Sequence, residues 1–414
     1  MKVTGSEALI KSLLEEGVDT IFGYPGGAIM PIYDALYSYM DQVNHILTRH
    51  EQGAIHAAQG YSRVSGKIGV CFATSGPGAT NLITGIADAQ IDSTPLVCIT
   101  GQVPSHLLGT DAFQESDVIG ISMPVTKWNY QITSSKEIPE IISKAFYIAK
   151  SGRPGPVLID ITKDAQFSDL NFKYKRCEKI RSYHPYPILD KNKVSDAANL
   201  IDKSKRPMIL VGQGVLLSNA EKELIEFSEK SGIPMASTLL GLSAVSCNHK
   251  NYVGYLGMHG NYGPNLKTNE CDLIIAIGMR FDDRVTGDTS KYAINAKVIH
   301  IEIDPSEIDK IIKTEVAINA DAKEALINLI PKIKKSSHES WINEFKECDK
   351  LEYDKIIDKE INNKEDKILM AEVVNKISNL TKGNAIVVTD VGQHQMVTSR
   401  YYKFNRPNSN ITSG

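Results

Sequence analysis

Short apolar segments alternate with amphipathic helical segments along most of this chain, and this alternation constrains its fold more than any other feature. Strands that alternate with helices form parallel sheets with helices on both faces. We therefore expect an α/β fold of successive doubly wound parallel-sheet domains. Helices are predicted at residues 6–16 and 52–64, and strands at 20–23, 45–47, 67–74, 96–100, 157–161, 208–211, 273–277, 297–303 and 385–389.

The chain has 414 residues, which is too many for one ordinary core because a domain takes about 100–200 residues. We expect an N-terminal domain at residues 1–168, a central domain at 190–331 and the incomplete beginning of a third domain at 367–414. Basic residues and prolines between 169 and 193 predict a solvated linker. The Lys- and Glu-rich residues 332–366 predict an exposed helical connector.

Composition and charge exclude several classes of protein. A formal net charge of -3 excludes an electrostatically driven nucleic-acid binder, which would carry a strongly basic face. No apolar run reaches the roughly 18 residues that cross a bilayer, and the charged residues between Lys2 and Glu16 are unlike a signal peptide. Scattered cysteines without a Cys-x-x-Cys pair indicate reduced thiols. We expect a cytoplasmic location, or an organelle matrix after loss of a targeting peptide.

Four predicted strands end in turns of small residues, at 23–27, 75–79, 211–215 and 278–284. Glycine lets the backbone approach a ligand, and ligands of open α/β sheets lie beyond the carboxyl ends of the strands. Each turn alone also has an ordinary explanation, since glycine helps to reverse any chain. A dinucleotide fingerprint at Gly212-Gln-Gly214 fails one test, because no acidic residue ends a strand about 20 residues later. The acids that end a strand, Glu302 and Asp304, come much further along the chain.

Glu51 lies between an apolar strand and a predicted helix. One interpretation is an acid that stabilises the N-terminus of the helix by about 0.3–1 kcal/mol. The other is a buried carboxylate that handles a proton on a ligand. The neighbouring His50 and His56 build no Ser-His-Asp or metal constellation, so the residues alone favour the first interpretation.

Taken together, these segments resemble the catalytic large subunits of acetolactate synthase (acetohydroxyacid synthase), a family of thiamine-diphosphate enzymes. The resemblance covers essentially the whole chain, and nine motifs occur in the family's order. They are Phe22-Gly-Tyr-Pro-Gly-Gly-Ala28, Arg49-His-Glu-Gln-Gly-Ala54, Ala73-Thr-Ser-Gly-Pro-Gly-Ala-Thr-Asn81, Thr100-Gly-Gln-Val-Pro104, Gly109-Thr-Asp-Ala-Phe-Gln-Glu115, Ser151-Gly-Arg-Pro-Gly-Pro-Val157, Leu256-Gly-Met-His-Gly260, Arg280-Phe-Asp-Asp-Arg284 and Val391-Gly-Gln-His-Gln-Met396. The fifth and eighth motifs separate this family from other thiamine-diphosphate enzymes.

The resemblance implies a thiamine-diphosphate-binding domain, a Rossmann-like FAD-binding domain and the start of a second thiamine-diphosphate-binding domain. It implies a transferase that decarboxylates pyruvate and joins the product to a second pyruvate or to 2-ketobutyrate. This reaction is the first common step of valine, leucine and isoleucine biosynthesis. The resemblance also reverses the interpretation of Glu51, whose family counterpart hydrogen-bonds the pyrimidine N1′ of the cofactor and promotes loss of the thiazolium C2 proton.

Further site residues follow from the same resemblance, position by position. Gly27, Ser93, Gln114, Gln393 and His394 are expected to bind cofactor, the last two on the diphosphate side of thiamine diphosphate. Phe113, Gln114 and Arg284 are expected to contact substrate. Arg284 would hold the acceptor carboxylate, unless it merely pairs with Asp282 or Asp283. The expected contacts of an architectural FAD are Gly212, Gln213, Gly214, Thr238, Leu239, Leu256, Gly257, Met258, His259, Gly278, Met279, Arg280, Phe281, Asp282, Glu302, Ile303, Asp321 and Ala322.

Magnesium is the third expected cofactor. Its family motif, Gly-Asp-Gly…Asn, would follow Gly414, so no metal ligand is assigned within the chain. We therefore expect a C-terminally truncated chain that is inactive by itself. The expected partners are further copies of the chain, in a dimer or tetramer with a shared active site, and a regulatory small subunit, with no nucleic acid and no membrane.

Two alternatives to this function remain. One is a non-catalytic truncated product that retains FAD or partner binding. The other is a different thiamine-diphosphate carboligase or oxidase. Glu51 argues against glyoxylate carboligase, which lacks this glutamate, and Gln114 and Arg284 argue against pyruvate oxidase.

Overall fold

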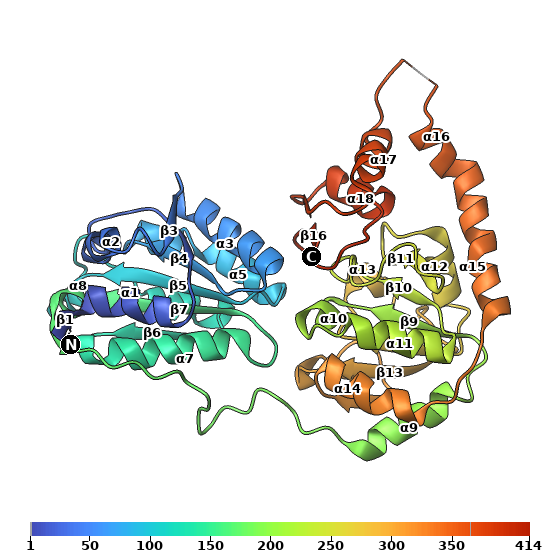
Figure 1. Ribbon diagram of the computed structural model, residues 1–414, viewed down its shortest axis with the longest axis horizontal. Coiled ribbons are helices and arrows are strands. Elements are labelled where there is room, and N and C mark those ends of the chain that lie inside the picture. The colour runs from blue at the N-terminus through green and yellow to red at the C-terminus, as the bar shows by residue number, and fades with distance from the viewer. Residues whose placement is uncertain (1, 365) are drawn as a thin grey trace. The chain divides into compact units, whose positions relative to one another are not determined.

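The computed structural model describes residues 2–364 and 366–414 and divides into two compact units, Met1–Pro185 and Tyr186–Gly414 (Figure 1). Each unit is built on its own six-stranded sheet, and every strand pairing in both sheets is parallel. The α/β class predicted from the sequence is therefore confirmed. No helix among the described residues is long and apolar enough to cross a membrane.

The sheet of the first unit has the strand order β3-β2-β4-β5-β7-β6. Its strands are β2 (Thr20–Gly23), β3 (Asn44–Leu47), β4 (Gly69–Ala73), β5 (Leu96–Gln102), β6 (Trp128–Ile132) and β7 (Pro156–Thr162). The helices of this unit are α1 (Gly5–Glu15), α2 (Met30–Tyr37), α3 (Glu51–Ser65), α4 (Pro77–Thr80), α5 (Ile83–Ile91), α6 (Val118–Ser122), α7 (Ile138–Lys150) and α8 (Lys163–Phe167).

Successive side chains of the central strands alternate between two buried cores. In β4, Val70 and Phe72 pack with helices α1, α2 and α7 on one face. Cys71 and Ala73 pack with α3, α5 and α6 on the other face. Because neither face meets water, these strands read as continuous apolar runs, which is typical of parallel sheets.

The sheet of the second unit has the strand order β11-β10-β9-β12-β13-β14. Its strands are β9 (Pro207–Val211), β10 (Met235–Ser237), β11 (Tyr252–Tyr255), β12 (Leu273–Ile277), β13 (Lys297–Glu302) and β14 (Val316–Asn319). The helices around it are α9 (Lys191–Ile201), α10 (Gln213–Leu217), α11 (Glu221–Ser231), α12 (Tyr262–Thr268), α13 (Asp283–Thr286), α14 (Ala322–Leu329) and α15 (Glu339–Glu352). Strands β10, β11 and β14 of this sheet were not predicted, and neither was β6 of the first sheet.

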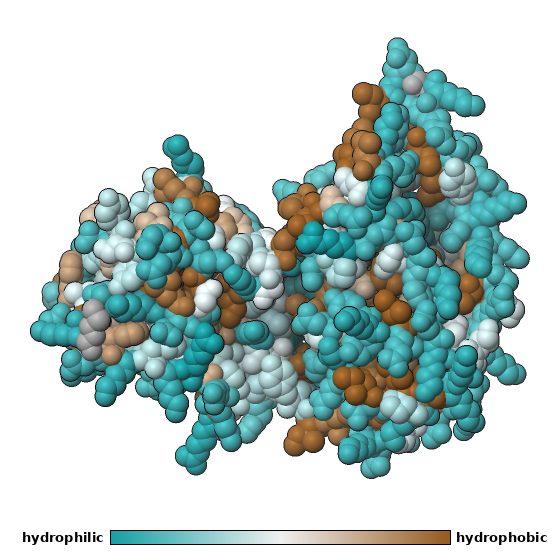
Figure 2. Space-filling model, in the orientation of Figure 1, coloured by the Kyte–Doolittle hydropathy of each residue, from teal (hydrophilic) through white to brown (hydrophobic). Residues whose placement is uncertain are grey.

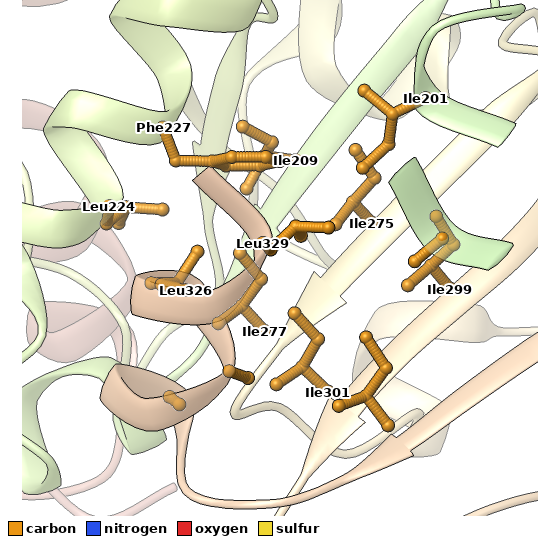
Figure 3. Close-up of a cluster of buried hydrophobic side chains, with 14 of the residues drawn as sticks. Ile201, Ile209, Leu224, Phe227, Ile275, Ile277, Ile299, Ile301, Leu326 and Leu329 are labelled. Atoms are coloured by element: carbon orange, nitrogen blue, oxygen red, sulfur yellow. The ribbon is translucent and has the colours of Figure 1, made fainter. Parts of the chain in front are cut away.

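One face of this second sheet carries a large apolar core. Isoleucines of β9, β12 and β13 point toward Phe227 of α11 and toward Leu326 and Leu329 of α14 (Figure 3). The isoleucines shown there include Ile209, Ile275 and Ile299. Alternation along the strands sends their neighbours to the opposite core, as in the first unit.

Two predicted connecting segments are more ordered than expected. The predicted linker 169–193 begins with strand β8 (Asp169–Asn171), which pairs antiparallel with β1 (Lys2–Thr4). The predicted exposed connector 332–366 contains α15, one face of which is buried. The expectation of full exposure was wrong for α15, because its apolar residues recur at helical spacing among the charges.

Trp341 anchors the start of α15 to the second unit. Its indole Nε1–H donates to the Pro207 carbonyl at 2.9 Å. The Arg206 guanidinium lies 4.2 Å from the ring centroid and the Lys267 ammonium 5.6 Å from it, within the range of cation–π attraction. Both cations also pair with Glu344 of the same helix, at 2.5 and 2.9 Å.

Glu352 anchors the other end of α15. Its buried carboxylate accepts the backbone N–H of Tyr262 at 3.1 Å, at the start of α12, and pairs with Arg400. Arg400 lies in α18 (Gln393–Tyr401), so one carboxylate joins three helices. After α15 the chain continues through π-helical η6 (Tyr353–Ile357) and α16 (Asp358–Ile361).

The C-terminal residues pack on the rest of the second unit. Tyr402 and Phe404 share a small core with Leu242 and Tyr255, and Asn410 donates to the Leu239 carbonyl at 2.9 Å. The strand predicted at 385–389 is shorter than expected, since β15 is Val387–Val388 and pairs with β16 (Asn410–Ile411). Helix α17 (Met370–Thr381) exposes apolar side chains, which appear as brown atoms in Figure 2.

The core of the second unit predicts that a buried and an exposed isoleucine contribute very differently to its stability. Ile299→Ala, in the fully buried core of Figure 3, should lower the free energy of unfolding of this unit by about 2–5 kcal/mol. Ile294→Ala, at a residue that is 71% exposed, should change it by less than about 0.5 kcal/mol. Urea unfolding followed by Trp341 fluorescence in a Trp128→Phe background measures both. Equal losses would contradict the assigned core.

Candidate functional site

Glu51 begins helix α3 directly after strand β3, at the carboxyl edge of the first sheet. The residue is only 7% exposed. Its Oε2 atom accepts a hydrogen bond from the Asn81 side-chain amide at 2.9 Å. No hydrogen bond to Oε1 comes from the residues that the structure describes. A buried carboxylate with one oxygen held and the other uncommitted is suited to contact a polar ligand atom.

The turns after β2 and β4 pack together beside Glu51, and Thr74 lies between them. A Cβ on Gly26 would lie 2.5 Å from the Thr74 side chain. A Cβ on Gly78 would lie 2.8 Å from the Thr74 methyl and 3.3 Å from Oε1 of Glu51. Both glycines are therefore required by packing. A Cβ on Gly27 would meet no atom within 4 Å, so the exposed Gly27 backbone can be approached from outside.

Gln114 reaches the same edge from the loop between β5 and α6. Its φ is 60°, and its carbonyl oxygen would lie 2.7 Å from a Cβ on Gly76. Gly76 has a φ of 60° and a ψ of -120°, a conformation that side chains rarely adopt. The Gln114 backbone therefore packs against the turn at Gly76, and the same turn places Gly78 beside Glu51. Phe113 precedes it and is 88% exposed.

Glu115 folds this loop by accepting two backbone N–H groups. Its two oxygens accept from Gly109 at 2.5 Å and from Ala112 at 3.0 Å. The hydrogen bond from Gly109, followed by that from Ala112, lowers the pKa of Glu115 below its ordinary value. The carboxylate therefore holds the Phe113–Gln114 loop in shape as long as it is ionised.

Asp160 on β7 connects the same loop to the interior of the sheet. It is fully buried and accepts hydrogen bonds from Thr100 at 2.6 Å, Gln131 at 2.9 Å and Gln102 at 3.0 Å. Burial raises the pKa of Asp160 in spite of these donors. The Gln102 amide also donates to the Ser116 carbonyl at 3.1 Å, so the network ends at the loop.

Ser93 is a predicted cofactor residue of the first unit that the structure does not bring to this edge. It precedes β5, whereas Glu51 follows β3, and parallel strands place these two positions at opposite edges of the sheet. Its hydroxyl accepts from Nε of Arg153 at 2.9 Å. Within the first unit, Ser93 is therefore separated from Glu51 by the length of the strands.

The residues predicted for FAD converge on one edge of the second sheet. Every one of the six strands ends next to at least one of them, and all six strands are parallel. The strand ends are followed by Gly212–Gly214 after β9, Thr238 and Leu239 after β10, Leu256–His259 after β11, Gly278–Asp282 after β12, Ile303 after β13 and Asp321 and Ala322 after β14, while Glu302 is the last residue of β13.

The glycines of this edge also have a packing role. The N–H of Gly212 donates to Ile277 and that of Gly214 to Gly278, at 2.9 and 2.8 Å. A Cβ on Gly214 would lie 2.6 Å from the Gly278 Cα. The turns after β9 and β12 therefore touch through their backbones, which only glycine permits.

The acidic residues of the edge serve the local fold. The carboxylates of Asp282 and Asp321 accept backbone N–H groups at the starts of α13 and α14. Glu302 is buried and accepts the N–H of Asp304 at 3.0 Å. The described residues contain no group of three or more His, Cys, Asp or Glu side chains placed to hold a metal ion.

Arg284 lies in α13 with its side chain 70% exposed. Its Nε atom is 3.8 Å from a carboxylate oxygen of Asp283, and the two side chains are both exposed. Such an ion pair contributes little to stability. The Arg284 carbonyl accepts the N–H of Met258 at 2.8 Å, which joins two of the predicted motifs. The guanidinium is therefore not held by Asp282, which caps the helix instead.

Gln393 and His394 open α18 after Gly392, whose φ is 152°. Both side chains are exposed and belong to the second unit, whereas Glu51 belongs to the first. The candidate residues therefore form separate groups, one at the edge of the first sheet and the others within the second unit.

Three residues of the site were missed by the sequence analysis. Asn81 holds Glu51, Glu115 shapes the loop and Asp160 connects that loop to the sheet. Asn81 and Glu115 lie inside recognised motifs but were given no role of their own. The only signal for Asp160 was an acid inside an otherwise apolar strand, which is rarely buried without partners.

Comparison with known proteins defines the class of this site. Residues 3–121 match the model of the thiamine pyrophosphate enzyme N-terminal TPP binding domain. Residues 194–329 match the thiamine pyrophosphate enzyme central domain. The central-domain match contains all six strands of the second sheet, and the N-terminal match contains strands β2–β5 of the first sheet. The chain therefore has the domains of a thiamine pyrophosphate enzyme.

Relatives that match the whole chain identify its family among the thiamine pyrophosphate enzymes. The chain is 45% identical to the acetolactate synthase large subunit of Buchnera aphidicola subsp. Schizaphis graminum, over 100% of this chain and 72% of that protein. It is 44% identical to the acetolactate synthase large subunit of Corynebacterium glutamicum, over 100% of this chain and 66% of that protein. It is 40% identical to the acetolactate synthase isozyme 3 large subunit of Escherichia coli, over 100% and 72%. The chain belongs to the acetolactate synthase large-subunit family.

The Glu115 anchor generates a prediction about the loop. Glu115→Ala should speed amide hydrogen exchange at Gly109 and Ala112 by about two- to fivefold, because both N–H groups lose their acceptor. Glu140→Ala, which removes an exposed ion pair with Lys144, is the matched control and should leave both rates unchanged.

The same loop should respond to acid. Since its hydrogen bonds lower the pKa of Glu115, the anchor persists as pH falls to the ordinary carboxyl range and is lost as pH falls through the lower folded-state pKa. Exchange rates corrected for intrinsic pH dependence measure this transition. A loop that loosens at a pH above the ordinary glutamate value would contradict the anchor.

Proposed function

We propose that this protein functions as an acetolactate synthase when it is assembled with its cofactors and partner subunits: the assembled enzyme decarboxylates one pyruvate and joins the two-carbon unit to a second pyruvate or to 2-ketobutyrate, in branched-chain amino-acid biosynthesis. The observation that carries the proposal is the buried Glu51, held by Asn81 at the strand edge, in a chain that is 40–45% identical over its whole length to three acetolactate synthase large subunits.

Thiamine diphosphate is the first proposed cofactor, and the edge of the first sheet fits it. Oε1 of Glu51 is available for the pyrimidine N1′, and the accessible Gly27 backbone lies in the neighbouring turn. When bound, thiamine diphosphate supplies the carbanion chemistry that decarboxylates a 2-keto acid and transfers the remaining unit. The role of Glu51 is to exchange a proton with N1′, while Phe113 and Gln114 limit access of water and orient the substrate.

FAD is proposed at the edge of the second sheet. Glycine turns and uncharged backbone groups follow its strands, which is the usual position of a dinucleotide in an open α/β sheet. The net reaction has no redox step, so FAD would act by stabilising the folded unit. Magnesium is proposed with the cofactor diphosphate, whose side Gln393 and His394 would contact.

Arg284 is proposed to bind the carboxylate of the acceptor. Its exposed guanidinium offers the planar pair of donors that matches a carboxylate. The backbone of α13 holds it beside Met258. Further copies of the chain and a regulatory small subunit are the proposed protein partners, consistent with the large-subunit names of the relatives.

Glu51→Gln tests the cofactor assignment. The amide keeps the size of the side chain but cannot exchange a proton with N1′, so proton exchange at C2 of bound thiamine diphosphate should slow by about 10²–10⁴-fold. Deuterium incorporation after rapid quenching, read by proton NMR, gives the rate. Exchange at the unmodified rate would remove Glu51 from the site.

Arg284→Ala tests the acceptor assignment. Loss of a charge-assisted bidentate contact should lower use of the acceptor about 10–100-fold while decarboxylation continues, so the ratio of carboligation to decarboxylation should fall. Arg284→Lys should rescue poorly, because an ammonium is a point charge. An unchanged ratio with loss of FAD would instead assign Arg284 a structural role in the second unit.

A further inference from the structure

Asn81 is the described side chain that hydrogen-bonds the Glu51 carboxylate, and neither the family comparison nor the proposed chemistry gives it a role. It follows α4, the short helix after the glycine turn of β4, and its backbone N–H donates to Pro77 at 3.0 Å. This placement directs the amide toward the start of α3. The contact joins residues 30 positions apart along the chain, at 2.9 Å.

The two oxygens of Glu51 have different surroundings. Oε2 is held by Asn81, whereas Oε1 lies over the backbone at Gly78, at 3.3 Å from where a Cβ would stand. The buried carboxylate could otherwise rotate about its last bond, because terminal torsions of this kind are broad. Fixing one oxygen therefore fixes the direction of the other.

We propose that Asn81 is a positioning residue, which orients Glu51 so that Oε1 faces the pyrimidine N1′ of thiamine diphosphate. This inference rests on the proposed function of Glu51. Asn81 itself touches neither cofactor nor substrate in this role. Its side-chain amide is a donor in both of its N–H positions, so it supports a carboxylate and cannot itself remove a proton from a ligand.

The test compares the affinity of the chain for thiamine diphosphate with that for its N1′-deaza analogue, in which a C–H replaces N1′. Calorimetric titration with each compound, in the presence of Mg²⁺, gives a preference ratio that reports the contact between Glu51 and N1′. In Asn81→Ala this ratio should fall about 10-fold or more, because the carboxylate loses the hydrogen bond that orients it. In a Glu51→Gln background, Asn81→Ala should change the ratio no further.

A matched control separates positioning from stability. Asn129 of β6 is also partly buried and donates to the Ile119 carbonyl at 2.7 Å and the Ser122 hydroxyl at 2.9 Å, away from Glu51. Asn129→Ala should leave the preference ratio unchanged even if it lowers the melting temperature. Should Asn81→Ala not fold, Asn81→Asp keeps the shape, replaces the donor by an acceptor and should lower the ratio in the same way.

The outcomes distinguish this inference from the function on which it rests. If Asn81→Ala weakens binding of both compounds equally and keeps the preference ratio, Asn81 is merely structural and the inference is overturned. If Glu51→Gln lowers the ratio in the same experiment, the proposed function of Glu51 still stands. If the unmodified chain shows no preference for thiamine diphosphate, the role of Glu51 fails and the inference fails with it.

Discussion

Burial of both faces of each parallel sheet is the constraint on which the rest of the structure depends. Alternate side chains of β4 enter two different cores, and the strands of the second unit do the same. Strands that are apolar on both faces hold few polar side chains between their ends, and one that is buried there, such as Asp160, is satisfied by hydrogen bonds from neighbouring strands. All strands of a sheet run in one direction, so the turns after them gather at one edge. Chemistry is confined to that edge by the way the sheet is buried.

At the edge of the first sheet, close packing of the turns determines how the site residues are brought together. Thr74 fills the space that side chains at Gly26 and Gly78 would need, and the backbone of Gln114 fills the space at Gly76. The glycines therefore bring three loops within contact of one another, rather than simply freeing the backbone. Glu51 is buried as a result, and its partner Asn81 arrives on the same turn.

Much of the fold was predictable because apolar periodicity is a local signal. The strand at Leu273–Ile277 and the helix at Glu51–Ser65 were placed within a residue or so. Strand β6 was missed because Asn129 and Gln131 interrupt its apolar run. Strand β14 was missed although it is as long as β2, which was predicted. Charged residues are frequent in α15, so its composition predicted an exposed helix and gave no indication that Trp341 is buried. The motifs located Glu51 and Arg284, but the partners of Asp160 lie on other strands, and contacts of that kind depend on the register of the sheet.

Helix α15 is fixed at two points, by Trp341 in contact with two cations and by Glu352, which joins it to α12 and α18. Each residue of an α-helix turns about 100° around the axis and rises about 1.5 Å. Insertion or removal of one residue between the two anchors would turn one of them away from its partners. The number of residues between Trp341 and Glu352 is therefore fixed by the distance and direction between the two sets of partners. Substitutions on the exposed face of α15 leave this spacing unchanged, whereas an insertion or a deletion does not.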